Sequence, residues 1–229
     1  MNYKRMVPNS ISGLSQMLGL ISIYLSMEKS FNLAAIFIIL AILADSCDGR
    51  AARALGVSGP FGVEMDSLCD VCSFGMAPAV LIYTYSLQQL GVPGMIISGL
   101  FAFGAAMRLA RFNVNVTAIH GYFQGMPAPA GACVIVTFVL GGMQISPLLT
   151  ALLTVAVACL MYSDVKYPDF KGHGNPLFRV PVIIAFILGA LVLWSDVKAW
   201  PFVIMFIYTL CGVLNAVYVK ITGKQAVFK

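Results

Sequence analysis

The chain has 229 residues, of which 60% are hydrophobic and 10% charged, and its formal net charge is +5. Soluble globular domains carry about 25% charged residues. The composition therefore excludes an ordinary soluble domain and predicts an integral membrane protein.

A helix needs roughly 17–25 mostly apolar residues to cross a bilayer. The sequence predicts eight such segments, which makes the fold an all-α, polytopic helical bundle. The fifth and sixth are short, and they fit either two separate spans or one re-entrant hairpin. The predicted spans cover residues 9–27, 31–53, 63–88, 93–114, 125–142, 146–162, 178–195 and 199–219.

The basic residues predict how these spans are oriented. With the N-terminus in the cytoplasm, all but two of the 14 lysines and arginines fall on the cytoplasmic side; the exceptions are Lys29 and Lys198. Lysine and arginine in short loops favour the cytoplasmic face. We therefore expect a multi-pass protein of the cytoplasmic membrane with both termini inside. The net charge then reflects this bias and anionic lipid, with no nucleic-acid partner.

Four carboxylates gather at the cytoplasmic ends of the second and third spans, at Asp45, Asp48, Asp66 and Asp70. Carboxylates beside membrane spans are costly and mark functional sites. Each pair is three or four residues apart and so lies on one helix face. The turn-forming stretch 56–60 between them lets the pairs face each other. Two helix ends presenting oxygen ligands predict a divalent-cation site for phosphate chemistry.

Written as D-x2-D-G-x2-A-R-x8-G-x3-D-x3-D, this segment matches the signature of the CDP-alcohol phosphotransferases at every defined position, so the chain resembles that family. Residues 66–78, 108–113 and 123–130 are similar to the integral-membrane phosphatidylserine synthase branch. The resemblance implies a six-helix catalytic core within residues 1–162. Residues 163–229 then add a cytoplasmic loop and two further transmembrane helices.

The resemblance also implies roles for the acidic residues. Asp45, Asp48 and Asp66 match the family's metal ligands for two Mg²⁺ or Mn²⁺ ions, and Asp66 holds the bridging position. Asp70 matches the general base that accepts the proton of the acceptor hydroxyl, and it is a candidate for further metal contact. A carboxylate is a weak base for an alcohol unless proton transfer accompanies attack.

A second group of residues is expected to hold the cytidine diphosphate. Gly49 and Gly62 have no side chain, which lets backbone approach the nucleotide closely. Arg53 matches the family's fixed arginine, a forked donor suited to a diphosphate. Asn9, after Pro8 at the start of the first span, fits the same family pattern.

The acceptor alcohol is expected near the cytoplasmic end of the fourth span. Arg108 and Arg111 lie three residues apart on one helix face, where they can hold the carboxylate of serine or a phosphate group. Charge alone does not decide between these ligands, and both arginines also satisfy the positive-inside rule. The similarity to the serine-using branch favours serine, with Asn113 as a further candidate for the pocket.

These observations predict a membrane transferase that moves a phosphatidyl group from CDP-diacylglycerol to L-serine, releasing CMP and forming phosphatidylserine. Within the same family, glycerol 3-phosphate or inositol phosphate is the alternative acceptor. From another class, a cation transporter also places carboxylates within membrane spans. The family resemblance further implies a homodimer embedded in membrane lipid.

Overall fold

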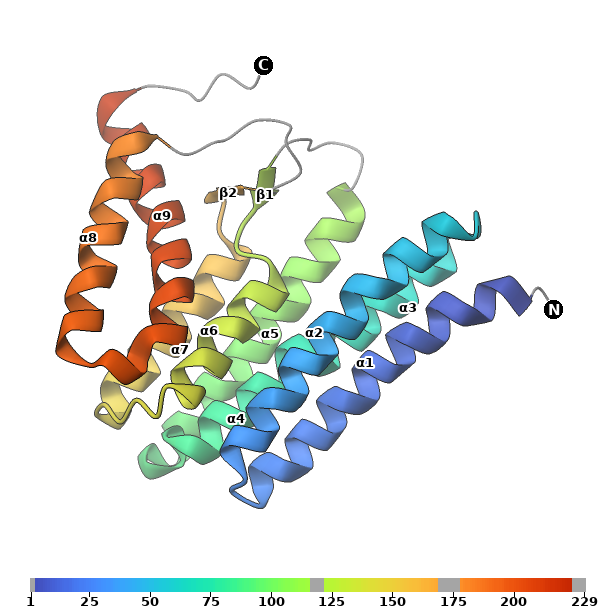
Figure 1. Ribbon diagram of the computed structural model, residues 1–229, viewed down its shortest axis with the longest axis horizontal. Coiled ribbons are helices and arrows are strands. Elements are labelled where there is room, and N and C mark those ends of the chain that lie inside the picture. Colours follow the sequence, from blue (N-terminus) through green and yellow to red (C-terminus); the bar gives the residue numbers. More distant parts are fainter. Residues whose placement is uncertain (1–2, 116–121, 169–177, 224–229) are drawn as a thin grey trace.

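The computed structural model describes residues 3–115, 122–168 and 178–223. Long helices run side by side and form one bundle, with a short two-stranded ribbon near one end (Figure 1). The elements in chain order are α1 (Tyr3–Met27), α2 (Phe31–Ala54), α3 (Pro60–Asp70), the π-helix η1 (Val71–Met76), α4 (Ala77–Tyr85), the 3-10 helix η2 (Leu87–Leu90), α5 (Val92–Asn115), β1 (Tyr122–Gln124), α6 (Ala128–Leu140), α7 (Pro147–Tyr162), β2 (Lys166–Pro168), α8 (Arg179–Ser195), the 3-10 helix η3 (Val197–Ala199) and α9 (Trp200–Thr222).

The helices confirm the predicted polytopic, all-α class. Within the described residues, five helical segments are long and apolar enough to cross a membrane: α1, α2, the continuous stretch α3–η1–α4, α5, and η3 with α9. Three shorter apolar helices, α6, α7 and α8, occupy the remaining predicted spans. The fifth and sixth spans become α6 and α7, which have 13 and 16 residues.

The first helix begins at Tyr3, ahead of the predicted start at residue 9. Pro8 therefore lies inside α1 and does not precede it. The residues before Pro8 include two cations, Lys4 and Arg5. A search for apolar segments omits such residues, although a helix can continue into the polar region beyond its apolar part.

The third span changes its winding directly after the last aspartate of the acidic cluster. α3 ends at Asp70, and the π-helix η1 follows before α4 resumes the α-helical winding. Pro78, at the start of α4, has no amide hydrogen for the preceding turn, and a wider turn relieves this mismatch. π-turns inside helices frequently occur at functional sites.

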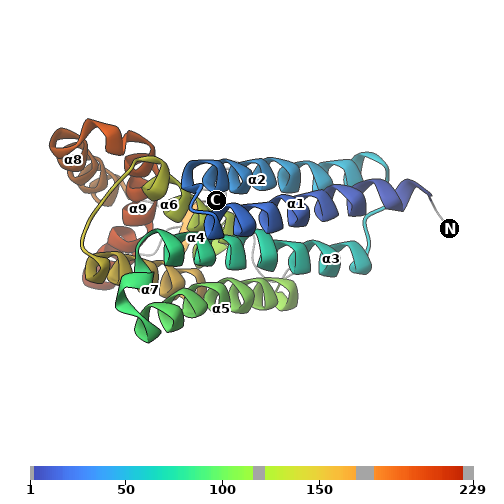
Figure 2. The ribbon, with the colours of Figure 1, turned by 90° about the horizontal axis from the view of Figure 1, so that it is seen from below.

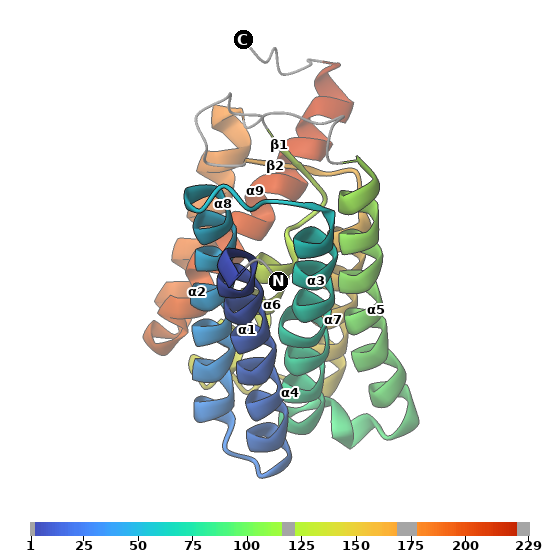
Figure 3. The same cartoon turned by 90° about the vertical axis from the view of Figure 1, so that its right-hand side faces the viewer.

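The acidic ends of two spans are held together by the first helix. α1 lies between α2 on one side and α3 with α4 on the other, as Figures 2 and 3 show from two directions. α5 packs against η1 and α7, while α6 contacts α2 and α9. The core between these helices contains Phe74, Phe101 and Phe138, all essentially inaccessible to solvent.

The ribbon joins the connection before α6 to the connection after α7. β1 and β2 are antiparallel, with Phe123 opposite Tyr167. The Tyr167 ring is fully buried against Gly212 of α9, and its hydroxyl donates to the carbonyl of Thr209 at 3.4 Å. β2 lies just beyond the predicted division at residue 162 and pairs with a strand before it. The division itself remains a prediction.

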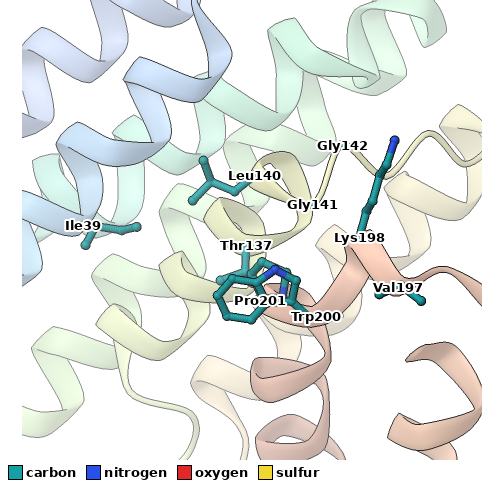
Figure 4. A pocket seen from close by; sticks show the side chains of 9 residues that line it. All are labelled: Ile39, Thr137, Leu140, Gly141, Gly142, Val197, Lys198, Trp200 and Pro201. Atoms are coloured by element: carbon teal, nitrogen blue, oxygen red, sulfur yellow. The ribbon is translucent and has the colours of Figure 1, made fainter. Parts of the chain in front are cut away.

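A cavity of about 730 Å³ lies where α2, the end of α6 and the start of α9 meet (Figure 4). Its lining is mainly apolar, with one cation, Lys198, at the turn between α8 and α9. None of the residues predicted to bind metal, nucleotide or acceptor lines it. The candidate site is therefore elsewhere, at the acidic ends of α2 and α3.

Candidate active site

The two acidic pairs converge as their spacing predicts. Asp45 and Asp48 lie in the last turns of α2, and Asp66 and Asp70 lie in α3. Asp45, Asp48 and Asp66 each offer a carboxylate oxygen, and these oxygens are all within 4.8 Å of one another. Asp45 also interacts with Asp70, which continues the cluster along the third span.

The cluster is partly to fully buried, and two of its oxygens lack a hydrogen-bond donor among the described residues. Asp48 and Asp70 are each only 7% exposed. Among the described residues, Asp66 Oδ1 and Asp70 Oδ1 are buried without a hydrogen-bond partner. Burying polar oxygens without partners is unfavourable, and neighbouring carboxylates also repel one another. A donor set made of carboxylate oxygens suits hard divalent cations such as Mg²⁺ and Mn²⁺, so these residues fit a divalent-cation site.

Ser12 contacts the cluster, although it lies outside the acidic signature. Its hydroxyl on α1 lies 2.6 Å from Oδ2 of Asp48 and donates to it. The two residues are 36 positions apart, so no local spacing connects them. A row of small polar residues along one face of α1 is the available signal, but such a row usually indicates helix packing alone.

The predicted nucleotide-binding residues form two neighbouring pairs. A Cβ atom placed on Gly62 would lie 3.8 Å from Oδ1 of Asn9, so α1 and α3 meet there. A Cβ atom placed on Gly49 would lie 3.4 Å from a guanidinium nitrogen of Arg53. Arg53 is exposed at the end of α2, and Asn9 is half-buried. The structure therefore brings these four residues to the same end of the bundle as the aspartates.

Of the residues predicted to bind the acceptor, Arg108 of α5 interacts with the acidic cluster. Its side chain is only 8% exposed, and its guanidinium lies 5.3 Å from the centre of the Phe112 ring. It interacts electrostatically with Asp70 and Asp45. A third span, α5, thus supplies a buried positive charge that interacts with the acidic cluster.

Arg111, one turn later, has a different set of partners. Nη1 donates to the carbonyl of Tyr162 at 2.9 Å and to Oδ1 of Asp164 at 3.3 Å. Nη2 donates to the carbonyls of Ser163 at 2.8 Å and Gln124 at 3.3 Å. Arg111 therefore ties the end of α5 to the segment after α7 and to β1.

Gly125 follows β1 beside this arginine. Its φ of +75° favours glycine, and a Cβ atom there would collide with the carbonyl oxygen of Met161 and approach Arg111 Nη2 at 2.8 Å. Part of the family resemblance is based on segment 123–130. The backbone conformation and the close contacts at position 125 of this segment require glycine.

Asn113 lies against the outer side of α3. Its Nδ2 donates to Ser67 Oγ at 3.0 Å and to Glu64 Oε2 at 3.4 Å. These contacts place Asn113 beside residues adjacent to the cluster, while Glu64 interacts with Asn113 at the helix surface. The structure therefore brings Arg108 to the acidic cluster and gives Arg111 and Asn113 protein partners of their own.

Comparison with known proteins identifies the class. The profile of the CDP-alcohol phosphatidyltransferase family matches residues 5–167. The chain therefore belongs to this family, which confirms the family resemblance and the prediction of an enzyme.

Three relatives narrow the class further. The chain is 32% identical to the CDP-diacylglycerol–serine O-phosphatidyltransferase of Helicobacter pylori over 93% of this chain and 92% of the relative. It is 34% identical to the protein of that name from Methanocaldococcus jannaschii, over 91% and 93% of the two chains. It is 40% identical to the archaetidylserine synthase of Methanothermobacter thermautotrophicus, over 73% and 72%.

Proposed function

We propose that the chain transfers the phosphatidyl group of CDP-diacylglycerol to the hydroxyl of L-serine at the cytoplasmic face of the membrane, forming phosphatidylserine and CMP. The observation that carries this proposal is the convergence of three aspartates from two spans, with Asp70 interacting with Asp45 and the buried Arg108 interacting electrostatically with both. The names of the similar proteins support serine as the acceptor.

Asp45, Asp48 and Asp66 are proposed to hold two divalent cations, Mg²⁺ or Mn²⁺, with Asp66 between them. Such cations, when bound, neutralise the pyrophosphate and stabilise the departing CMP. The close approach of the three carboxylates and the unpartnered oxygens of Asp66 and Asp70 support this assignment.

Asp70 is proposed as the general base. It accepts the proton of the serine hydroxyl while the serine oxygen attacks the phosphorus that carries the lipid. A new phosphorus–oxygen bond forms to serine, and the bond from that phosphorus to CMP breaks. Asp70 is 7% exposed, and the resulting exclusion of water protects the phosphatidyl group from hydrolysis.

The nucleotide is proposed to lie over the short residues near the ends of α2 and α3. Gly49 leaves the Arg53 guanidinium accessible, and Gly62 leaves the Asn9 side chain uncovered. A larger side chain at either glycine would occupy that space. Arg53 then binds the diphosphate as a forked donor, while Asn9 supplies amide groups for hydrogen bonds.

Arg108 is proposed to bind the serine carboxylate. Arg111 and Asn113 are proposed to act on the same pocket from its edge, because their side chains already bond to the protein. We further propose that the protein works as a homodimer with both termini in the cytoplasm, as the family resemblance and the distribution of basic residues suggest.

The proposal is tested by CMP release from CDP-diacylglycerol with purified full-length protein and one acceptor at a time. Serine is expected to give the fastest release, ahead of glycerol 3-phosphate and inositol phosphate, and a chelator is expected to stop it. Faster release with either phosphorylated acceptor would overturn serine as the substrate.

The two arginines are compared in the same assay. We expect Arg108→Ala to raise the KM for serine at least about tenfold, the effect of losing about 1.4 kcal/mol of binding, with little change in the KM for CDP-diacylglycerol. Arg111→Ala should raise the serine KM by a smaller factor and also lower thermal stability, because Arg111 bonds to three backbone carbonyls. An unchanged serine KM in Arg108→Ala would contradict its role.

A further inference from the structure

Ser12 makes the closest hydrogen bond to a carboxylate of the candidate site. The side chain is 4% exposed, and its Oγ lies 2.6 Å from Asp48 Oδ2 and 3.2 Å from the carbonyl oxygen of Pro8. A hydroxyl has one hydrogen to donate. The shorter distance is typical of a charge-assisted bond from a hydroxyl to a carboxylate, so the hydrogen is directed to Asp48.

The helix that carries Ser12 is fixed to both acidic spans. Ser15 and Ser22 donate to the carbonyls of Ala41 and Ala34 on α2, at 3.1 and 2.8 Å. On the other side, Ser73 of η1 donates to the backbone carbonyl of Ser15 at 2.9 Å. α1 is therefore hydrogen-bonded to both acidic spans, and it contacts Asp48 from outside the acidic signature.

We infer that Ser12 is a positioning residue that prepares Asp48 to bind a divalent cation. By donating to Oδ2, it fixes the rotamer of the carboxylate and leaves the other oxygen available to the cation. Groups that hydrogen-bond a metal ligand orient it, and their loss typically lowers metal affinity by about 10–100-fold. This inference depends on the proposed function only in that the acidic cluster binds a divalent cation.

Ser22 provides a matched control for this role. It is also buried on α1, and its hydroxyl also crosses to α2, but it donates to a backbone carbonyl and bonds to no carboxylate of the described residues. Ser12→Ala and Ser22→Ala therefore remove the same group from the same helix pair. A purely structural role predicts equal effects, whereas a positioning role predicts a difference in metal affinity alone.

The test measures Mn²⁺ binding by the full-length protein, without nucleotide, from the electron paramagnetic resonance signal of free Mn²⁺. We expect the Kd to rise about tenfold or more in Ser12→Ala and to stay within about twofold in Ser22→Ala, with similar thermal stability in both. If Ser12→Ala does not fold, Ser12→Cys replaces it, because the thiol is a weaker donor than the hydroxyl. The Kd of Ser12→Cys is then expected to lie above that of the unaltered protein. Equal Kd values for a folded Ser12 variant and Ser22→Ala would overturn the inference.

A double-mutant cycle with Asp48 adds a second criterion. In an Asp48→Asn background the carboxylate is gone, so Ser12→Ala should cause little further loss of Mn²⁺ affinity. A full additional loss there would mean that Ser12 acts elsewhere.

CMP release with serine is measured on the same unaltered protein. Intact Mn²⁺ binding without serine-dependent CMP release would contradict serine as the acceptor but would not contradict the role of Ser12. Normal release with an unchanged Kd in Ser12→Ala overturns that role alone.

Discussion

Helices α1 and α8 both pack against their neighbours through a row of small residues, but of the two only α1 contacts the site. The row on α8 consists of Pro181, Ala185 and Gly189, which face α9. The corresponding row on α1 is largely polar and faces α2 and the third span; it comprises Ser12, Ser15, Gly19, Ser22 and Ser26.

The difference lies in what the small residues bond to. In membranes, small residues let helices approach closely, and hydroxyls add hydrogen bonds across the interface. The α8 row has no hydroxyl, and much of the rest of α8 is exposed and apolar, including Phe186 and Trp194. α8 therefore packs against α9 with few directional bonds, whereas α1 is hydrogen-bonded to both acidic spans. Close packing alone does not position a carboxylate, because position requires directional bonds.

The largest expected effect is the loss of activity when an aspartate of the site is replaced, compared with an aspartate at the α8–α9 turn. Asp66→Asn should lower CMP release on the order of 10³-fold, the magnitude expected when a group that stabilises transition-state charge is lost, and it should weaken Mn²⁺ binding. Asp196 accepts a hydrogen bond from the backbone of Lys198 at 2.9 Å. Asp196→Asn should leave both measurements near the values of the unaltered protein. Comparable losses in the two variants would contradict the placement of the site.

A smaller effect is expected from filling the closest contact of α1. A Cβ atom on Gly19 would lie 2.7 Å from the Cα atom of Ser73, so backbone must shift. Gly19→Ala should destabilise the protein by about 1–3 kcal/mol, as overpacking does. Gly13, on the same helix, has open space, so Gly13→Ala should be neutral or slightly stabilising. Thermal unfolding of the two variants distinguishes them, and a stable Gly19→Ala protein would argue against a rigid α1.

The equivalent change on α8 should have less consequence. A Cβ atom on Gly189 would lie 2.5 Å from Cγ1 of Ile207, so a side chain must shift there, whereas at Gly19 the backbone must shift. Gly189→Ala should therefore destabilise the protein less than Gly19→Ala does and leave the Mn²⁺ affinity unchanged. If it destabilises the protein as much as Gly19→Ala does, or weakens Mn²⁺ binding, the contrast between the two helices is wrong.

The same contrast explains how far the sequence could be interpreted. The four aspartates are predictable because the members of each pair share a helix face and the turn between the pairs is marked by glycine and proline. The length of the apolar segments likewise predicts the bundle. These signals are local, so they do not require knowledge of which helices become neighbours.

The contacts that complete the site are not local. Arg111 of α5 bonds to Gln124 and to residues 162–164, which no spacing in the sequence brings together. The charge of Arg111 therefore suggests a ligand-binding role as readily as a structural one. The pairing of Phe123 with Tyr167 escapes prediction for the same reason, since strands of three residues carry too short a pattern.

The smallest expected effect concerns the contact between the ribbon and α9. Tyr167→Phe removes a hydrogen bond of 3.4 Å to the Thr209 carbonyl but keeps the ring against Gly212 and 5.2 Å from the Tyr208 ring. We expect a loss of about 0.5 kcal/mol near neutral pH, at the lower end for a hydrogen bond. Burial raises the pKa of Tyr167 above its ordinary value, because the charged phenolate is disfavoured there.

The pH dependence tests this contact more sharply than the size of the effect. Because the pKa of Tyr167 is higher in the folded than in the unfolded chain, its stabilising contribution is complete below the unfolded pKa of about 10 and is lost as pH rises above it. The unaltered protein should therefore lose more thermal stability than Tyr167→Phe above about pH 10, so the gap between them should close or reverse. A constant gap across this range would mean that Tyr167 is not buried in the folded protein, and that α9 does not anchor the ribbon through it.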